Sequence, residues 1–229
     1  MFFWDPTFIL LIPGIIIAAW AQHKVTATFD KYNRVGALSG MTAAQAARRI
    51  LNQQGLDHIR VEVIPGKLSD HYDPRAKALR LSQHVYHSSS LAAIGVAAHE
   101  AGHAIQHDEG YAPLAIRSSL VPVAQFGSNA AWILLLIGLI MGLPGLARIG
   151  VYAFAAVVLF QLVTLPVEYN ASGRALALLE GGGYLTREEI PQTKKVLDAA
   201  ALTYVAAALM GILQLIRLII ISGIGRSDE

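Results

Sequence analysis

The chain has 229 residues, of which 54% are hydrophobic and 15% are charged, and its mean hydropathy is +0.47. Soluble domains average ~25% charged residues, so this composition excludes an ordinary soluble or disordered protein and indicates a membrane protein with a modest polar part. The chain contains no cysteine, which excludes disulfide scaffolds, cysteine-ligated metal sites and thiol nucleophiles. A net charge of +2, dispersed along the chain, gives no reason to expect a nucleic-acid partner.

The apolar residues gather in four runs, at residues 8–21, 121–143, 149–167 and 199–221. A helix needs ~20 apolar residues to cross a bilayer, and ~17 is the lower limit. The last three runs meet this length, whereas the first meets it only if the aromatic residues 2–4 form an interfacial end. We therefore expect about four transmembrane helices.

The first run has the features of either a cleaved signal peptide or a membrane anchor. Ala19-Trp20-Ala21 has the small-x-small pattern of a cleavage site. A signal peptide begins with a basic segment, however, and here the basic residues follow the apolar run. We predict an uncleaved anchor whose N-terminus lies outside.

The charge distribution predicts the orientation of the chain in the membrane. A short connection at Pro144-Gly145 makes a hairpin of the second and third runs, so both polar segments lie on one side. These segments hold eleven and four of the 18 lysines and arginines, and the positive-inside rule places them in the cytoplasm. The predicted organisation is an anchor at 1–21, a cytoplasmic segment at 22–120, a transmembrane hairpin at 121–167, a cytoplasmic segment at 168–198, a transmembrane helix at 199–221 and a tail at 222–229, with both termini outside.

The polar segments show signals of regular structure. Thr42 caps an amphipathic helix that ends at Gly55. In the second segment, Thr186 and Glu189 predict a capping box at the start of a helix that continues into the fourth run. Between these elements we expect three short strands, at residues 59–64, 68–72 and 77–81. A buried helix is expected to begin at residues 88–90.

That buried helix carries His99-Glu100-Ala101-Gly102-His103, an HExxH motif. Two histidines four residues apart lie on one helix face, close enough to share a metal ion, and neutral imidazole suits zinc. Glu100 then lies beside the metal, where it can accept a proton from a metal-bound water. The alternative interpretation is a surface pair of histidines without a ligand role.

A catalytic zinc site requires three protein ligands and one open position. His107 continues the same helical stripe, but its distance of ~12 Å from His99 along the helix axis prevents the three histidines from surrounding one ion. Glu168 directly follows the third apolar run, and the hairpin returns it to the side of the motif. A carboxylate at the bilayer edge is costly unless it is paired, so Glu168 is the predicted third ligand, and a glutamate facing lipid headgroups is the alternative.

Several stretches of the chain resemble the YugP-like neutral zinc metallopeptidases of bacterial membranes. The resemblance implies a multi-pass zinc peptidase of the gluzincin type with Zn²⁺ as its cofactor. It also implies a mainly α-helical fold, in which about four transmembrane helices accompany a small zincin-like α+β part with a strand hairpin beside the HExxH helix. The matching stretches follow in order over nearly the whole chain, at residues 70–75, 79–82, 97–106, 120–124, 165–172 and 197–206.

The resemblance also suggests which residues support the ligands. In gluzincins the third ligand is a glutamate on a later helix, which matches Glu168. Membrane peptidases of the HtpX and CAAX-prenyl-protease kind carry an aspartate four residues further on, and it supports a zinc-binding histidine through a hydrogen bond. Here Ser172 takes that position, and it can accept a hydrogen bond but adds no charge. Asn170 is the alternative supporting residue.

In such folds a strand beside the motif helix pairs with extended substrate, and residues 68–73 are the candidate here. His71 or Tyr72 could then donate a hydrogen bond to the oxyanion of the reaction. The alternative is that both are turn-forming residues of a hairpin. Arg174 either binds a substrate carboxylate or pairs with an acidic neighbour, and the sequence favours the second role.

The predicted function is that of an integral membrane zinc endopeptidase that cleaves membrane proteins or peptides at the cytoplasmic face of the bacterial plasma membrane. The alternative is a non-catalytic zinc-binding membrane partner or chaperone subunit, although a structural zinc site needs a fourth protein ligand. A transporter is a third hypothesis, and the scarcity of ionisable residues in the apolar runs argues against it. Expected partners are the lipid bilayer and a protein or peptide substrate, with membrane quality-control proteins or a second copy of the chain as further candidates.

Overall fold

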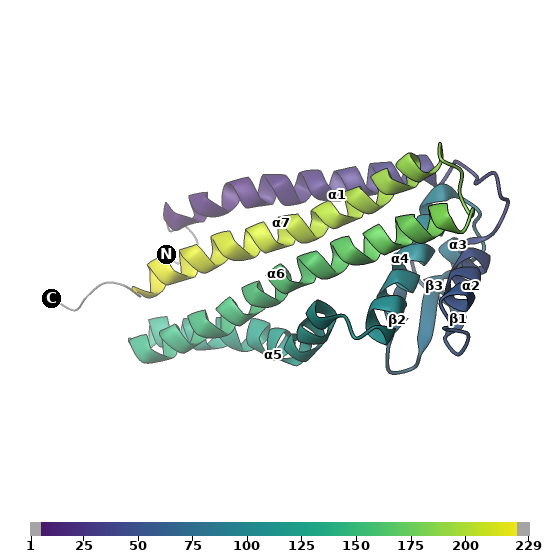
Figure 1. The fold of residues 1–229 in the computed structure, drawn as a ribbon. Coiled ribbons are helices and arrows are strands. Elements are labelled where there is room, and N and C mark those ends of the chain that lie inside the picture. The colour runs from purple at the N-terminus through teal and green to yellow at the C-terminus, as the bar shows by residue number, and fades with distance from the viewer. Residues whose placement is uncertain (1–5, 224–229) are drawn as a thin grey trace. The chain divides into compact units, whose positions relative to one another are not determined.

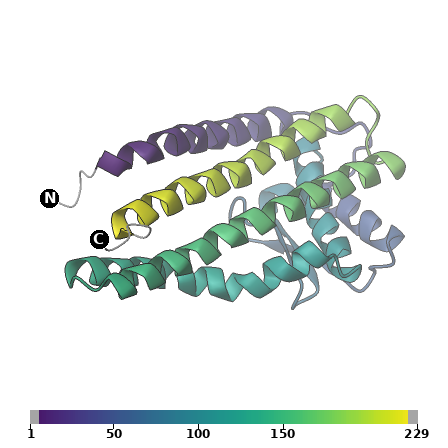
Figure 2. The ribbon, with the colours of Figure 1, turned by 60° about the vertical axis from the view of Figure 1, so that its left-hand side comes forward.

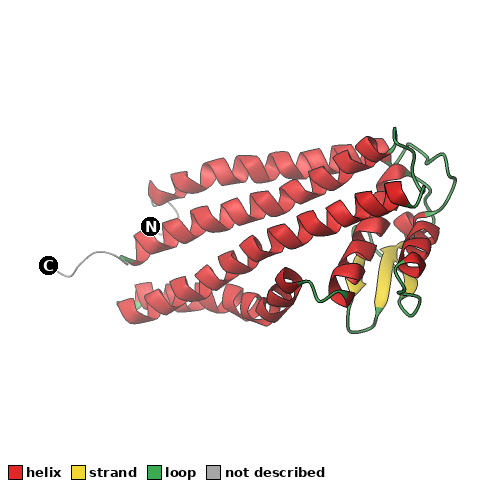
Figure 3. Cartoon of the chain, viewed as in Figure 1, coloured by secondary structure: helices red, strands yellow, loops and turns green. Residues whose placement is uncertain are grey.

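The computed structural model describes residues 6–223, which are mainly helical. The aromatic residues 2–4 and most of the predicted tail therefore lie outside the described residues. Figures 1 and 3 show the elements, which in chain order are η1 (Pro6–Leu11), α1 (Ile12–Tyr32), α2 (Ala43–Gln53), β1 (Arg60–Ile64), β2 (His71–Asp73), β3 (Ala78–Ser82), α3 (Gln83–Tyr86), α4 (Leu91–Asp108), α5 (Ala112–Ile140), α6 (Pro144–Gly181) and α7 (Ile190–Ser222).

Four helices are long and apolar enough to cross a membrane, which confirms the predicted membrane fold. They are Pro6–Tyr32, Ala112–Ile140, Pro144–Gly181 and Ile190–Ser222. Each is longer than the apolar run that predicted it, because the helix includes residues that flank the run on one or both sides. At 1.5 Å per residue the 38 residues of α6 extend ~57 Å, about twice the thickness of a hydrocarbon core.

The described residues divide into two compact units. The first, which we call the helical unit, consists of the described residues within Met1–Gln22, Ala115–Leu165 and Thr203–Glu229. The second, the mixed unit, contains His23–Leu114 and Pro166–Leu202. All four long helices thus contribute residues to both units, and every residue of the predicted site belongs to the mixed unit.

Small residues allow close helix packing in the helical unit. A Cβ atom at Gly150 of α6 would lie 2.8 Å from the carbonyl oxygen of Ala131 in α5, and one at Gly14 of α1 would lie 2.8 Å from the sulfur of Met210 in α7. Figure 2 shows both pairs of helices side by side. Gly142 has a φ of +65° in the turn between α5 and α6, so the chain reverses direction there.

The mixed unit contains a three-stranded sheet in the order β1-β3-β2. β1 pairs with β3 in parallel, and β2 pairs with β3 as the predicted antiparallel hairpin, with Tyr72 opposite Leu79. β2 and β3 begin later than predicted, at residues 71 and 78, because Leu68 and Lys77 adopt positive φ angles that interrupt extended backbone. The Asp70 carboxylate accepts hydrogen bonds from the backbone N–H and the hydroxyl of Ser82, which fixes the start of β2 against the end of β3.

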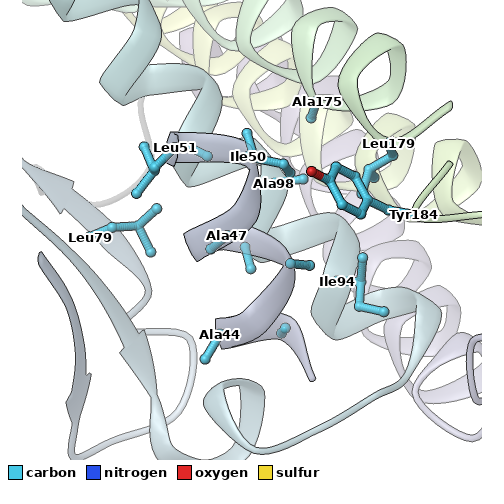
Figure 4. Close-up of a cluster of buried hydrophobic side chains, with 14 of the residues drawn as sticks. Ala44, Ala47, Ile50, Leu51, Leu79, Ile94, Ala98, Ala175, Leu179 and Tyr184 are labelled. Atoms are coloured by element: carbon cyan, nitrogen blue, oxygen red, sulfur yellow. The ribbon is translucent and has the colours of Figure 1, made fainter. Parts of the chain in front are cut away.

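Helices α2 and α4 form the core of the mixed unit together with the sheet and α6. The cap predicted at Thr42 is present at the start of α2 and forms a full capping box, because Thr42 and Gln45 exchange side-chain and backbone hydrogen bonds. Figure 4 shows how apolar side chains of α2 meet those of the other elements, with Leu51 toward Leu79 of β3 and Ile50 toward Ala98 of α4. The apolar face of α4, the helix that carries the motif, is therefore buried against α2, the sheet and α6.

The capping box predicted at Thr186 forms only in part. Glu189 Oε2 accepts a hydrogen bond from the Thr186 backbone N–H at 2.8 Å, as predicted. The Thr186 hydroxyl has no hydrogen-bond partner among the described residues, and α7 begins only at Ile190. The other oxygen of Glu189 accepts from the Leu38 backbone N–H at 2.7 Å, so this glutamate also holds a distant loop in place.

Candidate metal centre

Helix α4 presents the HExxH motif on its third and fourth turns. Ser90 is the N-cap residue, and its side chain accepts a hydrogen bond from the Ala93 backbone N–H at 3.2 Å. The alanines and glycines around the motif are buried, so neighbouring elements can approach the helix backbone closely. The His103 side chain is buried, whereas His99 and Glu100 are only partly buried.

Gly102 determines how closely α6 approaches the motif. A Cβ atom at this position would lie 2.7 Å from the carbonyl oxygen and 3.3 Å from the Cα of Ala171 in α6. Backbone atoms cannot move aside as a flexible side chain can, so only glycine permits this crossing. Glu168 precedes Ala171 by about one helical turn, and the crossing therefore brings Glu168 to the two histidines.

The three predicted ligands meet in the mixed unit. Glu168 Oε2 lies 3.2 Å from His99 Nε2 and 3.6 Å from His103 Nε2, and one donor atom from each residue lies within 4.8 Å of the others. The two imidazole rings are 4.7 Å apart and nearly perpendicular. Two imidazole nitrogens and one carboxylate oxygen form a donor set that fits Zn²⁺.

The Nδ1 atoms of both histidines face away from the donor set and have partners. His99 Nδ1 lies 3.1 Å from the Ser172 hydroxyl oxygen, the contact expected from the resemblance. His103 Nδ1 lies 3.0 Å from Gln106 Oε1, a contact that the sequence analysis missed. Asn170 contacts Gln106 rather than a histidine, at 2.9 Å. The sequence did contain a signal for this contact, because Gln106 is a polar residue three positions after His103 and therefore lies on the same helix face.

Glu100 is oriented by the edge strand of the sheet. Its Oε2 accepts a hydrogen bond from the Tyr72 backbone N–H at 3.0 Å. Burial raises the pKa of the Glu100 carboxyl above its ordinary value, although the neighbouring histidines act in the opposite direction. The carboxylate therefore has one oxygen held by β2, next to the predicted ligands on α4.

The structure brings Tyr72, but not the side chain of His71, to the motif helix. The Tyr72 hydroxyl lies 3.1 Å from His107 Nδ1, so His107 supports Tyr72 and is separate from the donor set. His71 is exposed, and its Nδ1 lies 2.7 Å from the Ser69 carbonyl oxygen. Successive side chains of a strand point to opposite faces, which is why only one of the two reaches α4.

Arg174 pairs with an acidic neighbour, the role that the sequence favoured. Its guanidinium lies 2.7 Å from Glu109 Oε2, and its Nε donates to Asn170 Oδ1 at 2.8 Å. The hydrogen bond from Arg174 lowers the pKa of the Glu109 carboxyl. Arg174 is therefore joined to the polar network behind His103 through Asn170 and Gln106.

Comparisons with known proteins show the family of the chain. A family model described as "Putative neutral zinc metallopeptidase" matches residues 7–223. The chain is also 46% identical over 220 residues to "Putative membrane protease YugP" of Bacillus subtilis (strain 168), an alignment that covers 96% of this chain and 98% of that protein. No solved structure matches the chain.

The family match extends over nearly all of the described residues and over both units. It agrees with the four apolar helices and with a donor set that suits zinc. We conclude that this chain is a membrane protein that belongs to the neutral zinc metallopeptidase family, with zinc as its cofactor.

Proposed function

We propose that the chain is an integral membrane endopeptidase of the gluzincin type. In this proposal His99, His103 and Glu168 are the zinc ligands, and Glu100 is the general base. The observation that supports it best is the approach of one Glu168 oxygen to both Nε2 atoms, at 3.2 and 3.6 Å. Residues from two helices form this set across a separation of more than 60 positions in the chain, which a surface pair of histidines would not require.

The surrounding residues are arranged as peptide hydrolysis requires. Bound zinc supplies the Lewis acidity that activates water and a peptide carbonyl. The Tyr72 N–H holds one oxygen of Glu100, and we assign the other oxygen to accept the proton of the attacking water and to pass it to the leaving amine. The supporting contacts of Ser172 and Gln106 keep both imidazole rings oriented.

We further propose that the site faces the cytoplasm and acts on membrane proteins, their exposed tails or peptides. The excess of lysine and arginine in both polar segments supports this orientation. The same distribution supports an anchor at residues 1–21 and termini on the opposite side. Quality-control partners or a second copy of the chain remain compatible with this arrangement.

The Glu100→Gln variant tests the proposed function. It removes the base and retains the size of the side chain, so zinc binding is expected to stay near one ion per chain. Cleavage of an unfolded test protein such as β-casein is expected to fall by about 10²–10⁴-fold, the usual contribution of a general base. Purified protein in detergent is measured for zinc content by atomic emission and for cleavage by gel and mass spectrometry.

Two controls make this test decisive. Glu62→Gln changes a glutamate of β1 outside the metal centre and is expected to leave both zinc content and cleavage unchanged. His103→Ala is expected to lose both. Wild-type cleavage rates in Glu100→Gln would refute the mechanism. Wild-type protein that retains zinc but cleaves neither soluble nor membrane-embedded substrates would favour the non-catalytic partner.

A further inference from the structure

We propose that Gln106 is a positioning residue that fixes His103 as the Nδ1–H tautomer, so that the Nε2 lone pair is available to a metal ion. The proposal rests on the proposed function where it treats His103 as a zinc ligand. Gln106 is fully buried, and every polar atom of its side chain has a partner. A buried amide with complete hydrogen bonding has a single favourable orientation.

The orientation of the amide follows from groups that have only one hydrogen-bonding role. A backbone carbonyl can only accept, and the Val167 oxygen lies 2.9 Å from Gln106 Nε2. An arginine can only donate, and Arg174 Nε lies 2.8 Å from Asn170 Oδ1. That Asn170 oxygen must therefore also accept from Gln106 Nε2, at 2.9 Å. Both amide hydrogens of Gln106 are thus directed toward α6.

The consequence for His103 follows directly. With both amide hydrogens used, Gln106 presents its carbonyl oxygen to His103 Nδ1, 3.0 Å away. A carbonyl oxygen cannot donate, so His103 Nδ1 must carry the hydrogen. In a neutral imidazole the other nitrogen, Nε2, then has the lone pair, and a metal ligand requires a lone pair at that position.

The network extends away from the metal centre to an ion pair. Arg174 is held by Glu109, whose Oε2 lies 2.7 Å from the guanidinium. The fixed donor role of Arg174 is therefore transmitted through Asn170 and Gln106 to His103. His99 has no equivalent control, because the Ser172 hydroxyl beside its Nδ1 can donate or accept. We infer that the two ligands differ, with the tautomer of His103 fixed and that of His99 adjustable.

Two substitutions at Gln106 separate this role from a purely structural one. Gln106→Glu keeps an oxygen acceptor for His103 Nδ1, whereas Gln106→Met has a similar length and no acceptor. Both lose the amide donors toward α6, so a purely structural role predicts that the glutamate is at least as damaging. The positioning role predicts the reverse order, with zinc affinity about 10–100-fold weaker in Gln106→Met and within a few-fold of wild type in Gln106→Glu.

The measurements are zinc competition against a chromophoric chelator and long-range ¹H–¹⁵N spectra of ¹⁵N-histidine-labelled, metal-free protein in detergent. The spectra are recorded at alkaline pH, where the imidazole is neutral. They are expected to show His103 as the Nδ1–H tautomer in wild type and Gln106→Glu, and as a mixture in Gln106→Met. Gln53→Met, on the exposed side of α2, is the matched control and should change neither readout. Thermal unfolding identifies a variant that has lost its fold.

If Gln106→Met does not fold, the same comparison is made at Asn170. Asn170→Asp keeps the acceptor for Arg174 and Gln106, and Asn170→Leu removes it, so only the second should broaden the tautomer population. An Nε2–H tautomer in the wild type, or equal zinc affinities for the paired variants, would overturn the proposal. The tautomer is read without zinc and without substrate, so it is decided even if the peptidase function fails its own test.

Discussion

Ser172 shows how one hydroxyl can influence the metal centre at the scale of single residues. Its oxygen lies 3.1 Å from His99 Nδ1, where related membrane peptidases are expected to have an aspartate. A hydroxyl orients the imidazole ring but adds no negative charge. The proposed ligand His99 is therefore supported less strongly than it would be by a carboxylate.

Removing this hydroxyl is expected to weaken zinc binding. In Ser172→Ala, His99 loses a hydrogen-bond partner at Nδ1, and zinc affinity should fall by about 10-fold. Chelator competition measures the change. Ser119→Ala is the control, because that hydroxyl bonds only to a carbonyl of its own helix, Ile116 O. Equal affinities of wild type and Ser172→Ala would show that the contact does not support the ligand.

Asp73 predicts a pH dependence of stability. Its carboxylate accepts hydrogen bonds from the backbone N–H groups of Ala76 and Arg75 and lies 2.7 Å from Arg80. The Ala76 N–H, together with Arg75 and Arg80, lowers the pKa of the Asp73 carboxyl in the folded protein. A lowered folded-state pKa stabilises the fold above the ordinary pKa of 3.8, and this contribution is lost as the pH falls through the folded-state value.

Asp73→Asn should therefore be less stable than wild type at pH 7, by about 1 kcal/mol for the loss of charge-assisted hydrogen bonds at a partly exposed site. The difference should disappear under acid conditions, below the pKa of the folded protein. Thermal unfolding in detergent at neutral and acid pH tests this expectation. A stability difference that is independent of pH would mean that the carboxylate charge is not involved.

At the scale of elements, the crossing of α4 and α6 brings the proposed metal ligands together. The contact between Gly102 of α4 and the Ala171 backbone of α6 sets the distance between the two helices. That contact also sets the positions of Glu168, Asn170 and Ser172 beside α4, because all three lie within about one turn of Ala171 on α6. The distance between the two helices thus controls the ligand set and its supporting contacts together.

Gly102→Ala should separate these helices. The new methyl group would meet backbone atoms 2.7 Å away, and the strain is expected to cost about 1–3 kcal/mol and to weaken zinc binding by at least about tenfold. Zinc competition and thermal unfolding measure the two effects. Gly173→Ala on α6 is the matched control, because nothing lies within 4 Å of a Cβ atom there, and it should retain full zinc affinity. Unchanged binding in Gly102→Ala would show that the crossing tolerates a wider spacing.

At the scale of the whole molecule, the absence of cysteine provides a direct test of orientation. Single cysteines introduced at exposed positions can be labelled with a membrane-impermeant maleimide in intact cells. Gln54→Cys and Arg187→Cys lie in the two polar segments, and Gly145→Cys lies in the first turn of α6, next to its connection with α5. If the site faces the cytoplasm, only Gly145→Cys should be labelled substantially, and the other two should remain near background.

Permeabilised cells provide the control for this experiment, since all three cysteines should then react. Labelling of Gln54→Cys in intact cells would reverse the proposed orientation. Labelling of only one of the two polar segments would refute the even number of crossings between them. Reversal of the orientation would leave the assignment of the metal ligands unchanged, because all of them lie within the mixed unit. Labelling of only one segment would refute that assignment as well, because Glu168 would lie across the membrane from His99 and His103.

The sequence by itself determined the membrane class, the positions of the four long helices and the motif. These follow from local physics, because the length of an apolar run sets whether a helix can cross a bilayer and an i, i+4 spacing sets a helix face. The sequence also allowed Glu168 to be predicted as the third ligand, because the hairpin returns it to the side of the motif. Thr42 is the helix cap as predicted, for the same local reason.

Only the tertiary structure decided which side chains support the ligands. The contact of Ser172 with His99 and the contacts of Gln106 with α6 join residues 61 to 73 positions apart, so no local pattern specifies them. No local pattern specifies the contact of Glu189 either, because one of its oxygens accepts a hydrogen bond from the Leu38 backbone N–H of a distant loop. Hydrogen-bond partners of buried polar groups depend on which backbones approach each other, and here that approach depends on a glycine at one helix crossing.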